Sequence, residues 1–218
     1  MNKRSERLRR LTAMAMLCAL SYVTVVLVRI PVVLFLNYEA KDVFLTIGGF
    51  LFGPVAGLCM SVAVALVEMV TISSTGPIGM LMNCISSALF VCTASLFYRR
   101  KKNLKNALIG LIVAACVMTA GMLLWNYLVT PWYMHVPRET VVDMLLPMFL
   151  PFNLLKGGLN AAFTMLLYKS AAAVLRATHL LPKTDTPVVP RKRLTVTLAA
   201  LGAVITLVLI LLVWKGII

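Results

Sequence analysis

The chain has 218 residues, of which 61% are hydrophobic and 13% charged, and its mean hydropathy is +0.95. Soluble domains carry roughly 45–50% apolar and about 25% charged residues, so this composition excludes a disordered or disulfide-stapled secreted protein and indicates a polytopic membrane protein. A formal net charge of +14 is also compatible with nucleic-acid binding, and the placement of the basic residues decides between the two.

The hydrophobic segments predict an all-α fold of six membrane helices followed by a seventh, separate one. A hydrocarbon core of roughly 30 Å requires about 20 apolar residues per helix, and most of the segments reach that length. They lie at 11–30, 43–53, 55–73, 78–98, 107–130, 144–170 and 194–214. The second segment is too short to span the membrane unless it is steeply tilted or partly buried among the other helices.

Basic clusters between these segments set the predicted orientation. Five Lys or Arg residues precede the first segment, five follow the fourth and six follow the sixth. Because an even number of crossings separates the clusters, all lie on one side, which the positive-inside rule makes cytoplasmic. The other side receives Arg29, Lys41, Arg138 and Lys215. The N-terminus is therefore predicted to be cytoplasmic, and the basic charge indicates topology rather than nucleic-acid binding.

Three regions follow from these segments. Residues 1–176 are predicted to form a six-helix membrane domain. The stretch 177–193 contains three prolines and many polar residues, which is typical of a linker. Residues 194–218 then supply an additional transmembrane helix. No internal repeat is visible, so the inverted-repeat architecture of many secondary transporters is not supported.

Motifs for catalysis or metal binding are missing from the sequence. All five cysteines lie inside apolar segments without paired or clustered spacing, and the two histidines lie in loops, so we expect neither disulfides nor a metal site. There is no GxxxxGK[ST] phosphate loop, no GxSxG elbow and no HExxH pair. We therefore predict that the chain is not an enzyme and does not hydrolyse ATP itself.

The sixth segment carries the densest polar group within the membrane. At about 100° per residue, Asn153, Lys156, Gly157 and Asn160 share one face of a helix. A charged group at bilayer depth costs on the order of 2.5–3.5 kcal/mol. Lys156 either pairs with a neighbouring carbonyl for packing or belongs to a stripe of donors that faces a buried ligand.

Other helices place polar groups at a matching depth. Asn83 and Asn126 lie near the outer ends of the fourth and fifth segments, and the outer loop 34–42 mixes aromatic and polar side chains. Glu68, near the outer end of the third segment, is either solvated or part of the site. A site built from amides, an ammonium and aromatic rings suits an uncharged or weakly acidic planar solute.

Five sequence elements make the chain similar to a known family. They are Asp42-Val43, Phe52-Gly-Pro-Val-Ala-Gly57, Gly76-Pro-Ile-Gly79 leading to Asn83, Asn126-Tyr127 with Thr130-Pro131 and Tyr133, and Pro151-Phe-Asn-Leu-Leu-Lys-Gly157. Over about residues 5–176 the chain resembles the substrate-binding S-components of energy-coupling-factor (ECF) vitamin importers. The last two elements are more specific, and they are similar to the riboflavin branch of that family.

The resemblance implies a six-helix membrane protein that takes riboflavin as transported ligand and holds no resident cofactor. The first outer loop and the outer ends of the fourth to sixth helices would grip it. By motif match, Asn126, Asn153 and Lys156 would donate or accept hydrogen bonds. The resemblance gives weaker support for a substrate-binding role of four further residues, namely Asn83, Leu36, Asn37 and Tyr38. Glu68 completes the expected substrate-binding set.

The resemblance also implies partners in a bacterial plasma membrane. A transmembrane coupling subunit would dock on Ala15 and Ala19, since small residues four apart let another helix approach closely, and two separate ATPases would supply the energy. Family members usually end after six helices, so 194–214 has no counterpart. Two alternatives stay open, namely an S-component for another vitamin and a stand-alone proton-coupled transporter.

Overall fold

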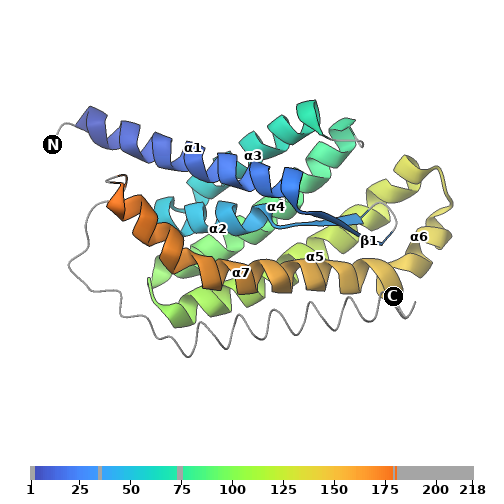
Figure 1. The fold of residues 1–218 in the computed structure, drawn as a ribbon. Coiled ribbons are helices and arrows are strands. Elements are labelled where there is room, and N and C mark those ends of the chain that lie inside the picture. Colours follow the sequence, from blue (N-terminus) through green and yellow to red (C-terminus); the bar gives the residue numbers. More distant parts are fainter. Residues whose placement is uncertain (1–2, 34–35, 73–75, 179, 181–218) are drawn as a thin grey trace.

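The computed structural model describes residues 3–33, 36–72, 76–178 and 180. Six main helices run alternately back and forth in one bundle (Figure 1). They are α1 (Lys3–Leu27), α2 (Lys41–Phe52), α3 (Pro54–Thr71), α4 (Gly76–Arg100), α5 (Leu104–Met134) and α7 (Leu150–Ala177). This confirms the predicted all-α bundle, whereas the helix predicted at 194–214 and nearly all of the predicted linker lie outside the described residues.

Five described helical stretches are long and apolar enough to cross a membrane. They are Arg4–Leu27, Pro54–Thr71, Gly76–Arg100, Leu104–Met134 and Arg138–Ala177. The fifth includes the short helix α6 (Arg138–Met144) and the π-helical turn η1 (Leu145–Phe149) before α7. Pro147 and Pro151 have no backbone N–H to donate in the regular α-helical pattern. The helix predicted at 144–170 therefore begins with the π-helical turn η1 instead of a regular α-helical turn.

A β-hairpin replaces the predicted end of the first helix and the outer loop. Helix α1 ends at Leu27, and strand β1 (Arg29–Val33) pairs antiparallel with β2 (Leu36–Glu39). Pro31 cannot donate to a helix, and the Val and Ile residues around it favour an extended backbone. The helix predicted to reach Ile30 therefore stops three residues earlier, and the two strands are not predicted from the sequence.

The short helix α2 begins inside the bundle rather than at its surface. Its 12 residues span about 18 Å, and nine of them are buried. Strand β2 leads directly into it, so the hairpin fills the remaining depth. This confirms that the second segment is partly buried among its neighbours. At its far end Gly53 adopts a positive φ of 96°, which glycine tolerates without strain, and Pro54 starts α3.

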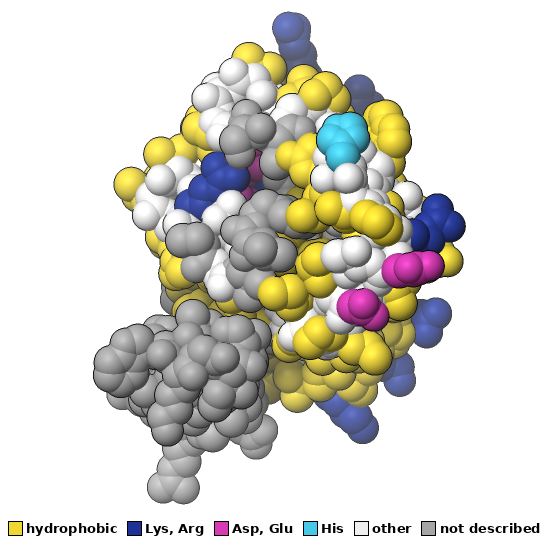
Figure 2. All heavy atoms as spheres, turned by 90° about the vertical axis from the view of Figure 1, so that its right-hand side faces the viewer, with side chains coloured by type: hydrophobic (Ala, Val, Ile, Leu, Met, Phe, Trp, Pro, Cys, Tyr) yellow, Lys and Arg dark blue, Asp and Glu magenta, His cyan; other side chains and the backbone are white. Residues whose placement is uncertain are grey.

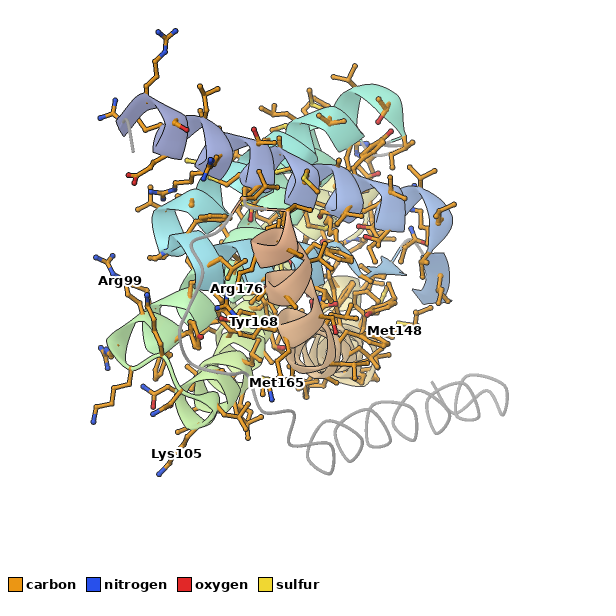
Figure 3. The ribbon with its side chains drawn as sticks, turned by 60° about the vertical axis from the view of Figure 1, so that its left-hand side comes forward. Arg99, Lys105, Met148, Met165, Tyr168 and Arg176 are labelled. Atoms are coloured by element: carbon orange, nitrogen blue, oxygen red, sulfur yellow. The ribbon has the colours of Figure 1, made fainter. Side chains whose placement is uncertain are left out.

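The two ends of the bundle differ in character. Arg99, Lys105 and Arg176 lie toward one end, while Met148 lies toward the other (Figure 3). We call the first the basic end and the second, which carries the hairpin and α6 (Figure 1), the hairpin end. The core toward the basic end is apolar and aromatic, with Phe50 stacked on Tyr98 at 4.5 Å between ring centroids.

Candidate functional site

A cavity of about 160 Å³ opens at the hairpin end between the hairpin, α4, α5 and α7. A single water molecule requires roughly 10–15 Å³ by the same measure, so the cavity has room for a small organic molecule. Its lining comprises Arg29, Leu36, Asn37, Glu39, Met82, Asn83, Ser86, Met122, Asn126, Phe152, Asn153 and Lys156. Figure 2 looks onto this end, where basic and acidic side chains lie together in a recess.

Six of the eight residues predicted to bind substrate line this cavity. They are Leu36, Asn37, Asn83, Asn126, Asn153 and Lys156. The other two, Tyr38 and Glu68, are buried behind the lining, and both hold lining or neighbouring side chains in place. Glu68 is only 4% exposed, which rules out the solvated position that its sequence context allowed. Residues far apart in the sequence thus meet around one small space.

Asn126 on α5 and Asn153 on α7 face the cavity from neighbouring helices. Each amide nitrogen donates one hydrogen bond to the carbonyl one turn earlier, over 2.7 Å to Met122 and Phe149, respectively. Because a side-chain amide carries two N–H donors and one carbonyl, both residues keep hydrogen-bonding capacity toward the cavity. The carbonyl of Asn126 also accepts a hydrogen bond from Thr130, which fixes its orientation.

Lys156 supplies an ammonium with unused donors. It is 5% exposed, and its Nζ lies 3.9 Å from Oδ2 of Asp42, beyond the usual hydrogen-bond distance. Within the part of the chain that the structure describes, this ammonium has an ion-pair partner but no hydrogen-bond acceptor. The predicted pairing with a carbonyl is therefore absent among these residues, and the three N–H donors of Lys156 are available to an acceptor in the cavity.

Asp42 lies behind Lys156 and is fully buried. Its Oδ1 accepts a hydrogen bond from Ser87 at 2.5 Å, and its Oδ2 accepts one from Asn160 at 3.2 Å. The carbonyl of Asn160 in turn accepts a hydrogen bond from the Tyr38 hydroxyl. This chain of contacts joins the hairpin to α2, α4 and α7, so it fixes the back wall of the cavity.

A second polar cluster supports the mouth of the cavity. The Nζ of Lys41 lies 3.1 Å from Oε2 of Glu39 and 2.5 Å from Oε2 of Glu68, and the amide of Asn83 donates to the same Glu68 oxygen. Arg29, the cross-strand partner of Glu39, contacts its other oxygen at 3.5 Å. Burial alone would raise the pKa of Glu39, but Lys41, with Lys156 and Arg29, holds that pKa below its ordinary value.

Apolar side chains form the remaining walls. Met82, Met122, Phe152 and Leu36 line the cavity between the polar groups. Leu36 and Phe152 also pack in a cluster with Val141 and Phe149. Among the described residues, the buried hydroxyl of Ser86 lines the cavity without a hydrogen-bond partner. The arrangement can hold a flat molecule whose ring faces are apolar and whose edge carries donors and acceptors.

The sequence prediction assigned no binding role to several lining residues. Arg29 entered only as a basic residue outside the membrane, and Glu39 only as part of a mixed outer loop. In the sequence, Arg29 and Glu39 are two opposite charges close to an apolar stretch. Their pairing depends on a hairpin that the sequence did not predict. Ser86 was recognisable as a polar residue one turn inward from Asn83.

The predicted docking residues lie on the outer face of α1. Ala15 and Ala19 are both exposed, and Leu11 is 62% exposed one turn earlier. The opposite face, with Ala13, Leu17, Ser21 and Val25, is buried against the bundle. Helix α1 therefore presents an apolar stripe with two small residues away from its own bundle.

Comparison with known proteins gives consistent matches. A family model described as "ECF transporter, substrate-specific component" matches residues 9–168. The chain is 29% identical to "Riboflavin transporter RibU" of Staphylococcus aureus (strain TCH60) over 77% of this chain and 93% of that protein. It is 27% identical to a protein of the same name from Streptococcus thermophilus (strain ATCC BAA-250 / LMG 18311), over 45% of this chain and 50% of that one.

A solved structure extends the likeness to three dimensions. It is described as "Structure and mechanism of the S component of a bacterial ECF transporter". The TM-score is 0.65 at 30% sequence identity, and the match covers 78% of this chain and 99% of the other. The two proteins thus share one fold over most of this chain.

Proposed function

The chain belongs to the family of substrate-specific components of ECF transporters, and from this premise we propose that its cavity captures riboflavin outside the cell for delivery inward. One observation carries the proposal: Asn126, Asn153 and Lys156 converge on one cavity with apolar walls. Two relatives that are named riboflavin transporters support the choice of ligand.

The chemistry of riboflavin fits the groups around the cavity. Its ring system is flat, and one edge alternates carbonyl acceptors with an N–H donor. The amides of Asn126 and Asn153 offer both donors and acceptors, and the ammonium of Lys156 suits a carbonyl oxygen. Phe152 and the neighbouring methionines cover ring faces, and a ribityl chain finds further polar partners in Asn37 and Asn83.

The charge at the two ends supports the proposed orientation. Arg99, Lys105 and Arg176 lie toward the basic end (Figure 3), which the positive-inside rule assigns to the cytoplasm. The N-terminus of α1 lies toward the same end (Figure 1). The cavity at the hairpin end then opens outward, as capture from outside requires.

A titration of the purified protein with riboflavin tests the ligand. We expect the flavin fluorescence to be quenched as riboflavin binds, with saturation at one site per chain. Riboflavin analogues that keep the ring edge should compete for this site. Absence of riboflavin binding by protein that is folded and binds another vitamin would overturn the choice of ligand and favour an S-component for that vitamin.

We also propose that α1 docks on a transmembrane coupling subunit that two ATPases drive. The exposed stripe with Ala15 and Ala19 supports this, because small residues let two helices approach closely. Ala15→Leu combined with Ala19→Leu should retain riboflavin binding and abolish ATP-driven uptake in vesicles that contain the whole complex.

The control for this experiment is the pair Ala120→Leu and Ala173→Leu, which enlarges exposed alanines on α5 and α7. We expect it to transport normally. Full uptake by the α1 double variant would contradict the docking surface. Riboflavin uptake by the chain alone in liposomes that hold a proton gradient and no ATPase would instead favour a stand-alone transporter.

A further inference from the structure

The charges in and behind the cavity wall balance one another. Three cations and three carboxylates lie in or directly behind its wall, so their formal charges sum to zero. The cations are Arg29, Lys41 and Lys156, and the carboxylates are Glu39, Asp42 and Glu68. Each cation lies within 4 Å of at least one of these carboxylates. The wall therefore offers a ligand no excess of positive charge.

Glu39 has a special place in this set. Of the described residues that line the cavity, it is the one acidic residue. Its two oxygens contact two different cations, Arg29 at 3.5 Å and Lys41 at 3.1 Å. The lowered pKa of Glu39 keeps its carboxylate ionised at neutral pH. Glu39 thus pairs, from within the protein, with Arg29, a lining cation that an anionic group on a ligand would otherwise use, and with Lys41 behind the wall.

The cavity is a poor environment for an unbalanced charge. Charge interactions are stronger in a buried site than in water, and an ionised group without a partner is costly to bury. A phosphate monoester carries about −1.5 to −2 charges at neutral pH. In this cavity it would meet the Glu39 carboxylate, and each cation there already lies within 4 Å of a protein carboxylate.

We infer that Glu39 is a specificity-determining residue, which makes the cavity select uncharged flavin over phosphate-bearing flavin. The inference rests on the proposed function, since it takes riboflavin as the ligand. The inference predicts a change in the ratio of the affinities for riboflavin and for phosphate-bearing flavin. A variant that weakens the binding of both ligands equally leaves this ratio unchanged. Removal of this one carboxylate leaves the wall with an excess positive charge next to the ligand.

Riboflavin and riboflavin 5′-phosphate titrated separately onto purified protein test the inference. Relative to the wild type, Glu39→Gln should shift the ratio of the two dissociation constants toward the phosphate by about tenfold, the lower end of the effects of close charge pairs across an interface. The matched control is Glu139→Gln, which removes the same charge from an exposed position on α6. It should leave the ratio within about twofold, because exposed charges are screened. An unchanged ratio in Glu39→Gln, or an equal shift in both variants, would overturn the inference.

Arg29→Gln keeps the inference testable where Glu39→Gln fails to fold. The Arg29 side chain is 35% exposed, so its loss disturbs the interior less. In this variant the Glu39 carboxylate has lost one of its two cations. The ratio of the two dissociation constants should therefore shift against the phosphate by about threefold, since solvent screens this partly exposed pair. No shift, or a shift toward the phosphate, would overturn the inference. If the wild type binds neither flavin, the proposed function fails instead.

Discussion

The two ends of the bundle are built on different principles. Toward the basic end the interior is filled by apolar and aromatic side chains, as in the cluster around Phe90, Leu111 and Met118, which are all fully buried. Toward the hairpin end the interior holds a fully buried lysine, Lys41, and a fully buried aspartate, Asp42, beside an open cavity.

The difference separates a half that is shaped by packing from a half that keeps an open cavity, where we propose the binding site. Buried ions are often no more stabilising than apolar side chains of the same volume, so the hairpin end gains little stability from them over an apolar core. What the ions supply instead is fixed donors and acceptors around a space that stays empty of protein. The basic end is a packed scaffold, and the hairpin end holds a preformed cavity.

The largest effect should come from removing Lys41, the cation shared by Glu39 and Glu68 in the second polar cluster. Lys41→Met leaves Glu39 and Glu68 buried without their shared cation, which should lower the free energy of unfolding by about 3–5 kcal/mol. Thermal unfolding of the purified protein in detergent measures it. Lys105→Met, at an exposed position of the basic end, is the matched control with little expected change. Equal stabilities of the two variants would erase the contrast between the ends.

Removal of the cavity ammonium should separate binding from stability. Lys156→Met takes away a charged hydrogen-bond donor worth about 1.5–3 kcal/mol, so riboflavin affinity should fall roughly 10- to 150-fold. Asp42 keeps its bonds to Ser87 and Asn160, so the bundle should still form in the membrane. Lys169→Met, nearer the basic end of the same helix, should bind normally. Unchanged affinity in Lys156→Met would reject its role.

A single methyl group on α7 should test how closely the site depends on helix spacing. A Cβ at Gly157 would lie 2.7 Å from the Ala115 Cβ and 3.0 Å from its Cα, so Gly157→Ala must push α5 and α7 apart. We expect a loss of about 1–3 kcal/mol in stability and weaker riboflavin binding. Gly158→Ala meets nothing within 4 Å and should be neutral or slightly stabilising. Identical behaviour of the two variants would contradict this close contact.

The smallest effect should come from the basic end. Tyr98→Phe removes the hydroxyl that lies 2.8 Å from the Tyr168 hydroxyl, at a cost of about 0.5–1.5 kcal/mol. Riboflavin affinity should stay within about twofold, since the pair lies remote from the cavity lining. Thermal unfolding and a flavin titration on the same sample measure both. A severalfold change in affinity would show that the two ends are coupled.

Much of the site was predictable because helical periodicity acts locally. The spacing of Asn153, Lys156 and Asn160 places them on one face whatever surrounds the helix, and a charge at that depth must face inward. The structure indeed buries all three. The burial of the 43–53 segment was one of the two arrangements that its length allowed, whereas the short helix α6 and the turn η1 add to the predicted helices.

The pairing of Arg29 with Glu39 was beyond such reasoning. It depends on the register of a hairpin that places these two residues opposite each other, and the sequence signal there was an apolar run followed by a polar loop. Likewise, Glu68 is an ordinary helix-end residue in sequence. The sequence named Glu68 as a candidate without a partner, and it meets Lys41 because α2 starts inside the bundle.

The sequence by itself determined that this is a multi-pass membrane protein, which face of each helix is polar, and which end is basic, because hydrophobicity, periodicity and charge are properties of short stretches of chain. The tertiary structure alone decided which carboxylate neutralises which cation and how large a space remains between them. Those outcomes depend on contacts between residues that lie far apart in the sequence, such as Asp42 and Asn160. Only the packed bundle brings such residues together.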